Sequence, residues 1–325
     1  MDINWQPLST FISQSSSFIL MTHIRPDADA LGSQLGLALG LEYLGKKVKT
    51  VIPSSVSPRY RFMDQGKRVD RFIMSDESLS NYEAIIVVDT GTWNQIGEFG
   101  SYMRSRDIPK AVIDHHRTQD DLGGIRFVDT SAEACGKLIY DALRYLNVPL
   151  TEQISSLLFA AIAMDTGWFR HSSTNESTFG IAKELVAAGA NPNLLYDHLF
   201  EHNSQGRIKL IGRVIERLSF ALNDRVAFLE VYLTDFPATG SVPSDSEDLI
   251  DYPRSIDGVE IAILFIEQSS QTTKVSFRSR LNIDIDKIAE EFGGGGHRLA
   301  AGALINAPIA ETRKRVLQAL EKLFV

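Results

Sequence analysis

Short apolar runs alternate with longer helical patterns over the first 190 or so residues. Where apolar residues recur at helical spacing, the sequence predicts helices at Ala30–Leu44, Thr151–Met164 and Glu176–Ala188. The shorter, β-rich runs predict strands at Phe18–Thr22, Val48–Ile52, Ala84–Val88, Ala111–Ile113 and Ile125–Val128. Strands that alternate with helices are typical of a parallel α/β sheet. We therefore predict an α/β domain over residues 1–192.

Local signals suggest where two helices begin or end. Thr130 and Glu133 have the spacing of a capping box, which predicts a helix that runs to about Leu146. Gly189, followed by Asn191-Pro192, predicts the end of the helix that starts at Glu176. Both signals fit the alternating pattern of the first domain.

The pattern changes in the last third of the chain. Residues 193–222 are helical in pattern but much more polar, which predicts a helical linker. Beyond it, the sequence predicts strands at Val226–Leu233, Glu260–Glu267 and Lys274–Arg280, and helices at Asp284–Phe292 and Ile309–Leu323. We expect a second, smaller α/β domain over residues 223–325.

Composition places the chain among ordinary globular proteins. It has 325 residues, of which 44% are hydrophobic and 23% charged. No apolar run reaches the roughly 18 residues that a membrane-spanning helix needs, and the opening residues lack the pattern of a signal peptide. The single cysteine, Cys135, cannot form an internal disulfide, which fits a reducing compartment. We expect a cytoplasmic protein with no membrane partner; monomer and homodimer both stay open.

The net charge of −8 narrows the choice of partners. Sequence-independent binding to long duplex nucleic acid needs a basic surface, so we expect no such partner. A short nucleotide held by a few local arginines remains compatible with this charge. A compact acidic site that binds divalent cations would also contribute to the negative balance.

Four segments place acidic or histidine side chains after predicted strands or near helix ends. In open α/β sheets, ligands bind outside the carboxyl ends of the strands, so we expect the four segments to meet there. They are Thr22-His23-Ile24-Arg25-Pro26-Asp27-Ala28-Asp29, Val88-Asp89-Thr90, Asp114-His115-His116, and Asp165 at the end of the apolar helix.

The residue types in these segments suit a pair of divalent metal ions. Such a pair activates water and stabilises the charge that develops during attack on a phosphoryl group, and it needs about six or seven ligands. The candidates are His23, Asp27, Asp29, Asp89, His115 and Asp165. Mixed imidazole and carboxylate ligands suit manganese or cobalt better than calcium.

Each candidate also has an ordinary structural interpretation. A single aspartate after a strand usually caps a helix or forms a turn, and Asp27-Ala28-Asp29 could simply cap the following helix. Asp114-His115-His116 directly after an apolar strand is poor core material and offers no obvious cap. Four such segments in one domain favour the metal site.

These motifs resemble a known superfamily of enzymes. Asp114-His115-His116 after a strand, with His23-x-x-x-Asp27-x-Asp29, resembles the DHH phosphoesterases. Near the other end, Phe292-Gly293-Gly294-Gly295-Gly296-His297 with Ala300-Ala301-Gly302, and the strand Val275-Ser276-Phe277-Arg278-Ser279, resemble the DHHA1 domain. The resemblance covers nearly the whole chain. Its two-domain form is similar to the nano-RNase group, which are bifunctional oligoribonucleases and 3′-phosphoadenosine-5′-phosphate (PAP) phosphatases.

The resemblance implies a role for each metal-site residue. One ion would be held by His23, Asp27 and Asp89, and the other by Asp29, Asp89, His115 and Asp165, so that Asp89 bridges the two. Asp114 would orient His115, and His116 would face the scissile phosphate, which makes Asp114, His115 and His116 the expected catalytic residues. Manganese is the expected ion, with magnesium and cobalt as alternatives.

The glycine-rich segment is the expected substrate-binding element. Consecutive glycines let backbone N–H groups approach a ligand, although a bare run of glycines could equally be a hinge. Arg278 offers a planar fork suited to a phosphate. With the resemblance, the expected substrate-binding residues are Arg278, Ser279, Gly294, Gly295, Gly296 and His297.

The resemblance implies a metal-dependent phosphoesterase that degrades short RNA to mononucleotides and dephosphorylates PAP to AMP. Three alternatives remain open. The metal motif is compatible with a cyclic-dinucleotide or linear pApA phosphodiesterase. An inorganic pyrophosphatase or exopolyphosphatase shares the N-terminal motifs, but its C-terminal domain differs. A non-catalytic nucleotide sensor would usually have lost metal ligands, and here all are present.

Overall fold

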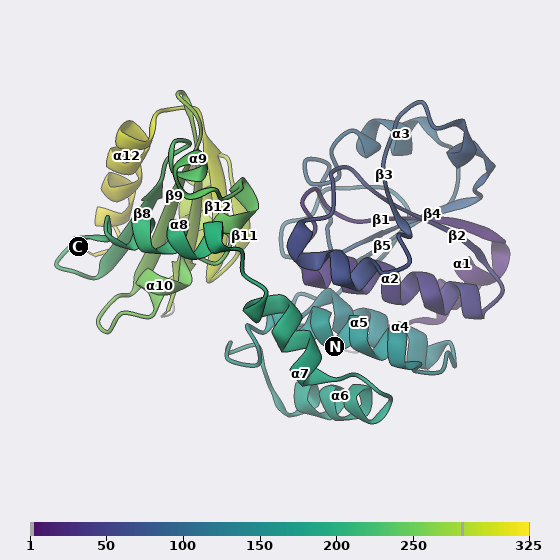
Figure 1. Cartoon of the computed structure of the whole chain (residues 1–325). Coiled ribbons are helices and arrows are strands. Elements are labelled where there is room, and N and C mark those ends of the chain that lie inside the picture. Colours follow the sequence, from purple (N-terminus) through teal and green to yellow (C-terminus); the bar gives the residue numbers. More distant parts are fainter. Residues whose placement is uncertain (1–2, 281–282, 325) are drawn as a thin grey trace. The chain divides into compact units, whose positions relative to one another are not determined.

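The computed structural model describes residues 3–280 and 283–324, and the chain divides into two units, Met1–His202 and Asn203–Val325 (Figure 1). Each unit has its own sheet and its own core. The mixture of helices and sheets confirms the predicted α/β class. Within the described residues, no helix is long and apolar enough to cross a membrane.

The first unit is built on a six-stranded sheet in which all neighbouring strands are parallel. Its order is β3-β2-β1-β4-β5-β6. The strands are β1 (Ser17–Met21), β2 (Lys47–Ile52), β3 (Val69–Arg71), β4 (Ala84–Val88), β5 (Lys110–Asp114) and β6 (Ile125–Val128). After β3 the chain returns to the other side of β1, so the order reverses between β1 and β4. This reversal is the position where open α/β sheets bind ligands.

Helices cover both faces of this sheet (Figure 1). Alternate strand residues point to opposite faces, and both sets are apolar, as expected for a buried parallel sheet. Ile19, Ile85 and Val112 pack in one core with α3 (Phe99–Ser105). Phe18 and Ile86 pack in the other core with the remaining large helices. These helices are α1 (Gln6–Gln14), α2 (Ala28–Tyr43), α4 (Cys135–Tyr145), α5 (Glu152–Asp165) and α6 (Glu176–Ala187).

Shorter helical segments complete the first unit. Two are 3₁₀ helices, η1 (Pro58–Asp64) and η2 (Glu77–Asn81). The unit ends with α7 (Pro192–Tyr196) and the π-helix η3 (Asp197–Glu201), and the next helix, α8 (Gln205–Ile215), belongs to the second unit. Most of the segment predicted as a helical linker, residues 193–222, is therefore helical, with its two halves packed in different units, but its last residues form the strand β7 (Ser219–Ala221) instead.

The second unit has a mixed six-stranded sheet of order β11-β12-β10-β9-β8-β7. Only β8 and β9 pair in parallel; the other neighbours are antiparallel. The strands are β7 (Ser219–Ala221), β8 (Val226–Val231), β9 (Ile261–Ser269), β10 (Thr272–Ser279), β11 (Gly295–His297) and β12 (Ala300–Ile305). Apolar residues of α11 (Ile285–Glu291) and α12 (Ile309–Glu321) pack on one face. Those of α8 and α9 (Asp235–Thr239) pack on the other face. The short segments η4 (Pro243–Ser246) and α10 (Asp251–Arg254) follow α9 in the sequence.

Candidate metal centre

The candidate ligands gather at the carboxyl ends of β1, β4 and β5, on either side of the reversal in strand order. His23 follows β1, Asp89 follows β4 directly, and Asp114 is the last residue of β5. Because parallel strands end at the same edge of the sheet, these segments lie together. The start of α2 supplies two further aspartates and the end of α5 supplies Asp165.

The first group of candidate ligands is His23, Asp27 and Asp89. One ligand atom from each lies within 4.8 Å of the others. The His23 Nε2 atom is 3.4 Å from Asp89 Oδ2, and the other ring nitrogen, Nδ1, is 2.9 Å from the carbonyl oxygen of Ile24. Asp27 is also the N-cap of α2, where its Oδ1 accepts a hydrogen bond from Ala30 N at 3.0 Å. The capping interpretation and the ligand interpretation of Asp27 are therefore compatible.

The second group is Asp29, His115 and Asp165, again with ligand atoms within 4.8 Å of one another. The buried ring of His115 directs Nε2 at three carboxylates. It lies 3.6 Å from Asp29 Oδ2, 3.4 Å from Asp89 Oδ1 and 3.5 Å from Asp165 Oδ2. The two groups thus meet at Asp89, whose two oxygens face His23 and His115 respectively.

Asp89 provides a test of whether these residues fit metal ions. Its side chain is 3% exposed, and Oδ1 has no hydrogen-bond partner among the described residues. A buried carboxylate oxygen without a partner is costly, and coordination of a cation is one way to compensate it. The backbone of Asp89 has a φ of +59°, a region that aspartate and asparagine tolerate better than most residues. The donor set and the unpaired oxygen both fit a cation at this position.

The titration properties of the centre reflect its crowded charges. Burial would lower the pKa of His23, but the hydrogen bond with Asp89 and the charge of Asp27 outweigh it and raise the pKa to about 9. Burial raises the pKa of Asp165 to about 6, against the opposing effect of His115. Burial likewise raises the pKa of Asp29, and the neighbouring charge of Asp89 adds to this effect. Without metal, the centre therefore holds protons that cations would displace.

Asp29 is fixed by the N-terminus of α4. Its Oδ2 accepts from Cys135 N at 2.7 Å and its Oδ1 from Gly136 N at 2.8 Å. The predicted capping box of Thr130 and Glu133 is wrong, because α4 begins only at Cys135 and its N-cap residue makes no side-chain hydrogen bond. The first N–H groups of the helix, which have no partner within it, are instead satisfied by a carboxylate more than a hundred residues away in the sequence.

The structure corrects the expected partner of Asp114. The buried carboxylate accepts from His116 Nδ1 at 2.8 Å, whereas Nδ1 of His115 lies 3.1 Å from the carbonyl oxygen of Ala132. Asp114 holds the ring of His116 and contacts His115 through its backbone N–H, at 2.9 Å. His116 Nδ1 is also 3.8 Å from Asp89 Oδ1.

Gln119 is a member of this network that the sequence did not reveal. Its Nε2 donates to Asp114 Oδ2 and to the carbonyl oxygen of His116, and its Oε1 accepts from Arg126 at 2.7 Å. A lone glutamine five residues after the motif carries no recognisable sequence signal. Its position depends on the loop between β5 and β6.

The expected substrate-binding residues of the second unit lie on neighbouring strands. Arg278 and Ser279 are at the end of β10, and Arg278 pairs with Ala300 of β12, which in turn pairs with His297 of β11. Backbone pairing therefore brings Arg278 and the glycine-rich segment into one region. The side chain of His297 lies outside the described part of the structure.

Part of the glycine run is regular structure, because Gly295 and Gly296 belong to the short strand β11. Close packing of this strand requires at least two of the glycines. A Cβ atom on Gly294 would lie 2.1 Å from the carbonyl oxygen of Gly302, and one on Gly296 would lie 2.5 Å from that of Ala300. Gly296 also has a φ of +145°.

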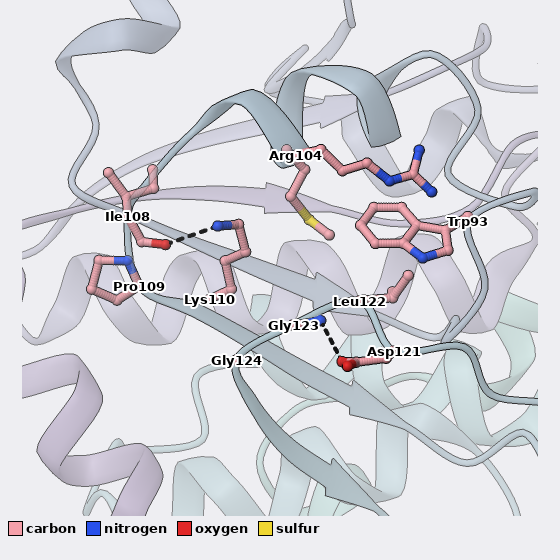
Figure 2. A pocket seen from close by; sticks show the side chains of 10 residues that line it. Trp93, Arg104, Ile108, Pro109, Lys110, Asp121, Leu122, Gly123 and Gly124 are labelled. Atoms are coloured by element: carbon pink, nitrogen blue, oxygen red, sulfur yellow. Dashed lines mark hydrogen bonds between the residues drawn. The ribbon is translucent and has the colours of Figure 1, made fainter.

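A hollow of about 370 Å³ elsewhere in the first unit is lined by none of the candidate ligands. Figure 2 shows the guanidinium of Arg104 against the ring of Trp93, 3.7 Å from its centroid. Trp93 N donates to Asp120 Oδ2 at 2.9 Å, so the hollow borders the loop that carries Gln119. The ionisable groups concentrate at the strand ends rather than in this hollow, so the strand ends remain the candidate site.

Comparison with known proteins agrees with this geometry. Residues 17–162 match the N-terminal domain of the DHH family, and residues 223–325 match the DHHA1 domain. The bifunctional oligoribonuclease and PAP phosphatase NrnA of Bacillus subtilis (strain 168) is 30% identical over 319 residues, which cover 96% of each chain. The cyclic-di-AMP phosphodiesterase PdeA of Listeria monocytogenes is 26% identical over 97% of this chain, which spans 49% of PdeA.

A solved structure has the same fold. The crystal structure of an exopolyphosphatase-related protein from Bacteroides fragilis superposes with a TM-score of 0.90 and 22% identity. The match covers 98% of this chain and 96% of that one, so the similarity of fold extends over both units. From the two family domains and the full-length relative, we conclude that the chain belongs to the DHH–DHHA1 phosphoesterases, hydrolases that act on phosphoester bonds.

Proposed function

We propose that this phosphoesterase releases mononucleotides from very short RNA and removes the 3′-phosphate of PAP to give AMP. The observation that carries the proposal is the pair of ligand groups that share the buried carboxylate of Asp89. The full-length similarity to a protein named for both activities supports the choice of substrates. The single buried cysteine fits a function in the reducing cytoplasm.

Two divalent ions, with manganese preferred, are part of this proposal. His23, Asp27 and Asp89 would hold one ion, and Asp29, Asp89, His115 and Asp165 the other. When bound, such a pair supplies an activated water for attack on phosphorus and neutralises charge on the phosphoryl oxygens. Imidazole and carboxylate ligands together suit manganese, and magnesium and cobalt remain alternatives.

His116 is the protein group that we assign to the phosphate. Asp114 accepts a hydrogen bond from its Nδ1, and in the protonated imidazole we assign its Nε2 to donate a second one to a phosphoryl oxygen. Burial lowers the pKa of His116, but the hydrogen bond with Asp114 outweighs that effect and raises it. A protonated imidazole next to an anionic phosphate forms a charge-assisted hydrogen bond. Gln119 and Asp114 would hold the ring in this orientation.

The second unit would bind the remainder of the nucleotide. Arg278 has a guanidinium that suits a phosphate, and the backbone of Gly294, Gly295 and Gly296 presents N–H groups without side chains in front of them. Ser279 and His297 are the other residues that we assign to this function. Recognition by few groups fits a short substrate better than a long one.

The test compares four substrates with manganese-loaded protein: a labelled RNA dinucleotide, PAP, cyclic di-AMP and pyrophosphate. An Asp114→Ala/His115→Ala protein serves as the blank. Our proposal expects mononucleotide from the dinucleotide and phosphate from PAP, both lost in the blank. No turnover of the dinucleotide or of PAP by the wild type would contradict the proposal.

The similarity to the cyclic-di-AMP phosphodiesterase PdeA supports one second candidate, a cyclic-dinucleotide or linear pApA phosphodiesterase. Cleavage of cyclic di-AMP without turnover of short RNA or PAP would favour this candidate. Turnover of pyrophosphate alone would indicate a pyrophosphatase, and metal binding without turnover of any substrate would indicate a sensor.

A further inference from the structure

The last turn of the first unit contains a second cluster of potential metal ligands. Asp197 and His198 lie on the π-helix η3, and His202 follows its end. One ligand atom from each lies within 4.8 Å of the others. None of the three is a candidate ligand of the metal centre at the strand ends. The cluster lies where the chain leaves the first unit.

The π-helical turn explains why these side chains meet. Its hydrogen bonds run from residue i to residue i+5, a spacing that matches Asp197 and His202. His202 Nε2 is 2.9 Å from Asp197 Oδ2. The ring centroids of His198 and His202 are 5.0 Å apart, with the rings at 82° to each other. Single π-helical turns are rare and occur frequently at functional sites.

Contacts with η1 hold one of the ligands in place. The ring of His198 stacks on Phe62, with centroids 4.6 Å apart and 12° between the planes. Arg59, also in η1, donates from Nε to the carbonyl oxygen of Leu199 at 2.9 Å. The π-helix is therefore fixed against η1, and a preorganised ligand loses little freedom when it binds an ion.

An ordinary surface ion pair between Asp197 and His202 would explain only part of this arrangement. Their side chains are 42% and 57% exposed, and exposed ion pairs contribute little to stability. Such a pair accounts neither for the second histidine nor for the rare π-helical turn that brings all three side chains together.

We propose that Asp197, His198 and His202 bind a transition-metal ion of the zinc class. Two imidazoles and one carboxylate are ligands that zinc accepts in tetrahedral sites, and a water molecule can fill the fourth position. Calcium and magnesium prefer all-oxygen ligands, so the histidines select against them. A bound ion would link the first residue of the π-helical turn to the residue that follows it.

Zinc titration of the full chain after removal of metals by a chelator tests this proposal. The number of zinc ions per chain is measured by equilibrium dialysis with elemental analysis, for the wild type and for His198→Ala and His202→Asn. We expect each variant to bind one ion fewer than the wild type, or to bind it about tenfold or more weakly. The difference is independent of how many ions the metal centre at the strand ends holds.

Glu201→Ala is the matched control, because Glu201 is an acidic residue of the same π-helix outside the cluster. It should bind as many ions as the wild type. Histidine NMR provides a second readout, in which zinc should shift the imidazole signals of His198 and His202 together. Equal stoichiometry with equal affinity in the wild type and both histidine variants would overturn the proposal, as would an equal loss in Glu201→Ala.

Discussion

At the scale of single residues, Asp89 connects the two groups of metal-centre candidates. Its oxygens face His23 and His115, and one of them has no hydrogen-bond partner among the described residues. Burial alone would raise the pKa of this carboxyl, but the neighbouring imidazoles of His115, His23 and His116 outweigh burial and keep it well below its usual value. Asp89 therefore stays ionised, as a ligand of two cations must.

Asp89→Asn should reduce the number of bound manganese ions from two to at most one and weaken the remaining site about tenfold or more. The amide has one oxygen and no charge, so it cannot bridge two cations. Asparagine tolerates the positive φ of this position, so the fold should persist. Manganese EPR during titration measures the stoichiometry.

Asp129→Asn is the control for this substitution, because Asp129 is an aspartate outside the set of candidate ligands, and its Oδ1 accepts from the backbone and side chain of Ser131. It should bind two ions, as the wild type does. If the Asp89→Asn protein bound two manganese ions with unchanged affinity, Asp89 would not be a ligand shared by both ions.

Manganese binding should release protons at pH 7.5. His23, with a pKa of about 9, carries a proton there that it must lose to coordinate an ion. Calorimetry in two buffers with different ionisation enthalpies should therefore give different binding enthalpies, and affinity should rise from pH 6 to pH 9. Identical enthalpies in both buffers would contradict this prediction.

The same shift affects the stability of the metal-free protein. The pKa of His23 in the folded state is raised above its usual 6.5. The stability that protonation of His23 adds to the metal-free fold is therefore fully present below pH 6.5 and is lost as the pH rises through about 9. Asp165 has a raised pKa of about 6, so ionisation of this carboxyl destabilises the metal-free fold as the pH rises from about 4 to about 6.

At the scale of elements, close packing of α2, α4 and α5 sets the positions of the ligands. A Cβ atom on Gly32 of α2 would lie 2.4 Å from the carbonyl oxygen of Leu157, and one on Gly136 of α4 would lie 2.6 Å from Ala161 Cβ. These glycines let the three helices approach one another. Because Asp29 lies near the start of α2 and Asp165 ends α5, helix separation controls the distance between these ligands.

Gly32→Ala should destabilise the protein by about 1–3 kcal/mol, the usual cost of overpacking a core. Gly180→Ala is a matched control, because the exposed helical Gly180 has nothing within 4 Å of an added Cβ atom. It should stabilise the protein by about 0.5–1 kcal/mol through helix propensity. Chemical denaturation of the metal-free proteins gives both values, and equal effects would contradict the packing argument.

Much of this architecture can be predicted from the sequence, because buried parallel strands and amphipathic helices leave strong patterns. Strands β4 and β6 have the predicted bounds, and the other predicted strands and helices differ by a few residues. Strand β3 was missed because Val69-Asp70-Arg71 is short and polar. Strand β12 was missed because small residues dominate its sequence, AAGALI.

The candidate site, too, could be predicted only in part from the sequence. The residue types at the strand ends suggested the metal site, and the structure brings all six candidates together. The partners that fix them could not be predicted, because the capping of α4 by Asp29 and the contact of Gln119 with Asp114 depend on tertiary packing.

At the scale of the whole molecule, our proposal gives different tasks to the two units. The candidate ligands of the metal centre and His116, which we assign to the scissile phosphate, lie in the first unit, and the residues that we assign to the remainder of the nucleotide lie in the second. Each unit has its own hydrophobic core. Substitutions in the second unit should therefore change substrate affinity without changing metal binding.

Arg278→Ala should raise the KM for an RNA dinucleotide by about tenfold to a hundredfold, the value of one charge-assisted hydrogen bond. Metal stoichiometry should not change. Lys274→Ala removes a cation from the same face of β10 and serves as the control, with little expected effect. An unchanged KM in Arg278→Ala would contradict the assigned role of Arg278.

The most direct test of the central claim is manganese-dependent release of mononucleotide from a labelled RNA dinucleotide, measured for the wild type and Asp89→Asn side by side. The account predicts turnover by the wild type that disappears on chelation, returns with manganese and is lost in the variant. Equal turnover by the two proteins, or none by the manganese-loaded wild type, would contradict it.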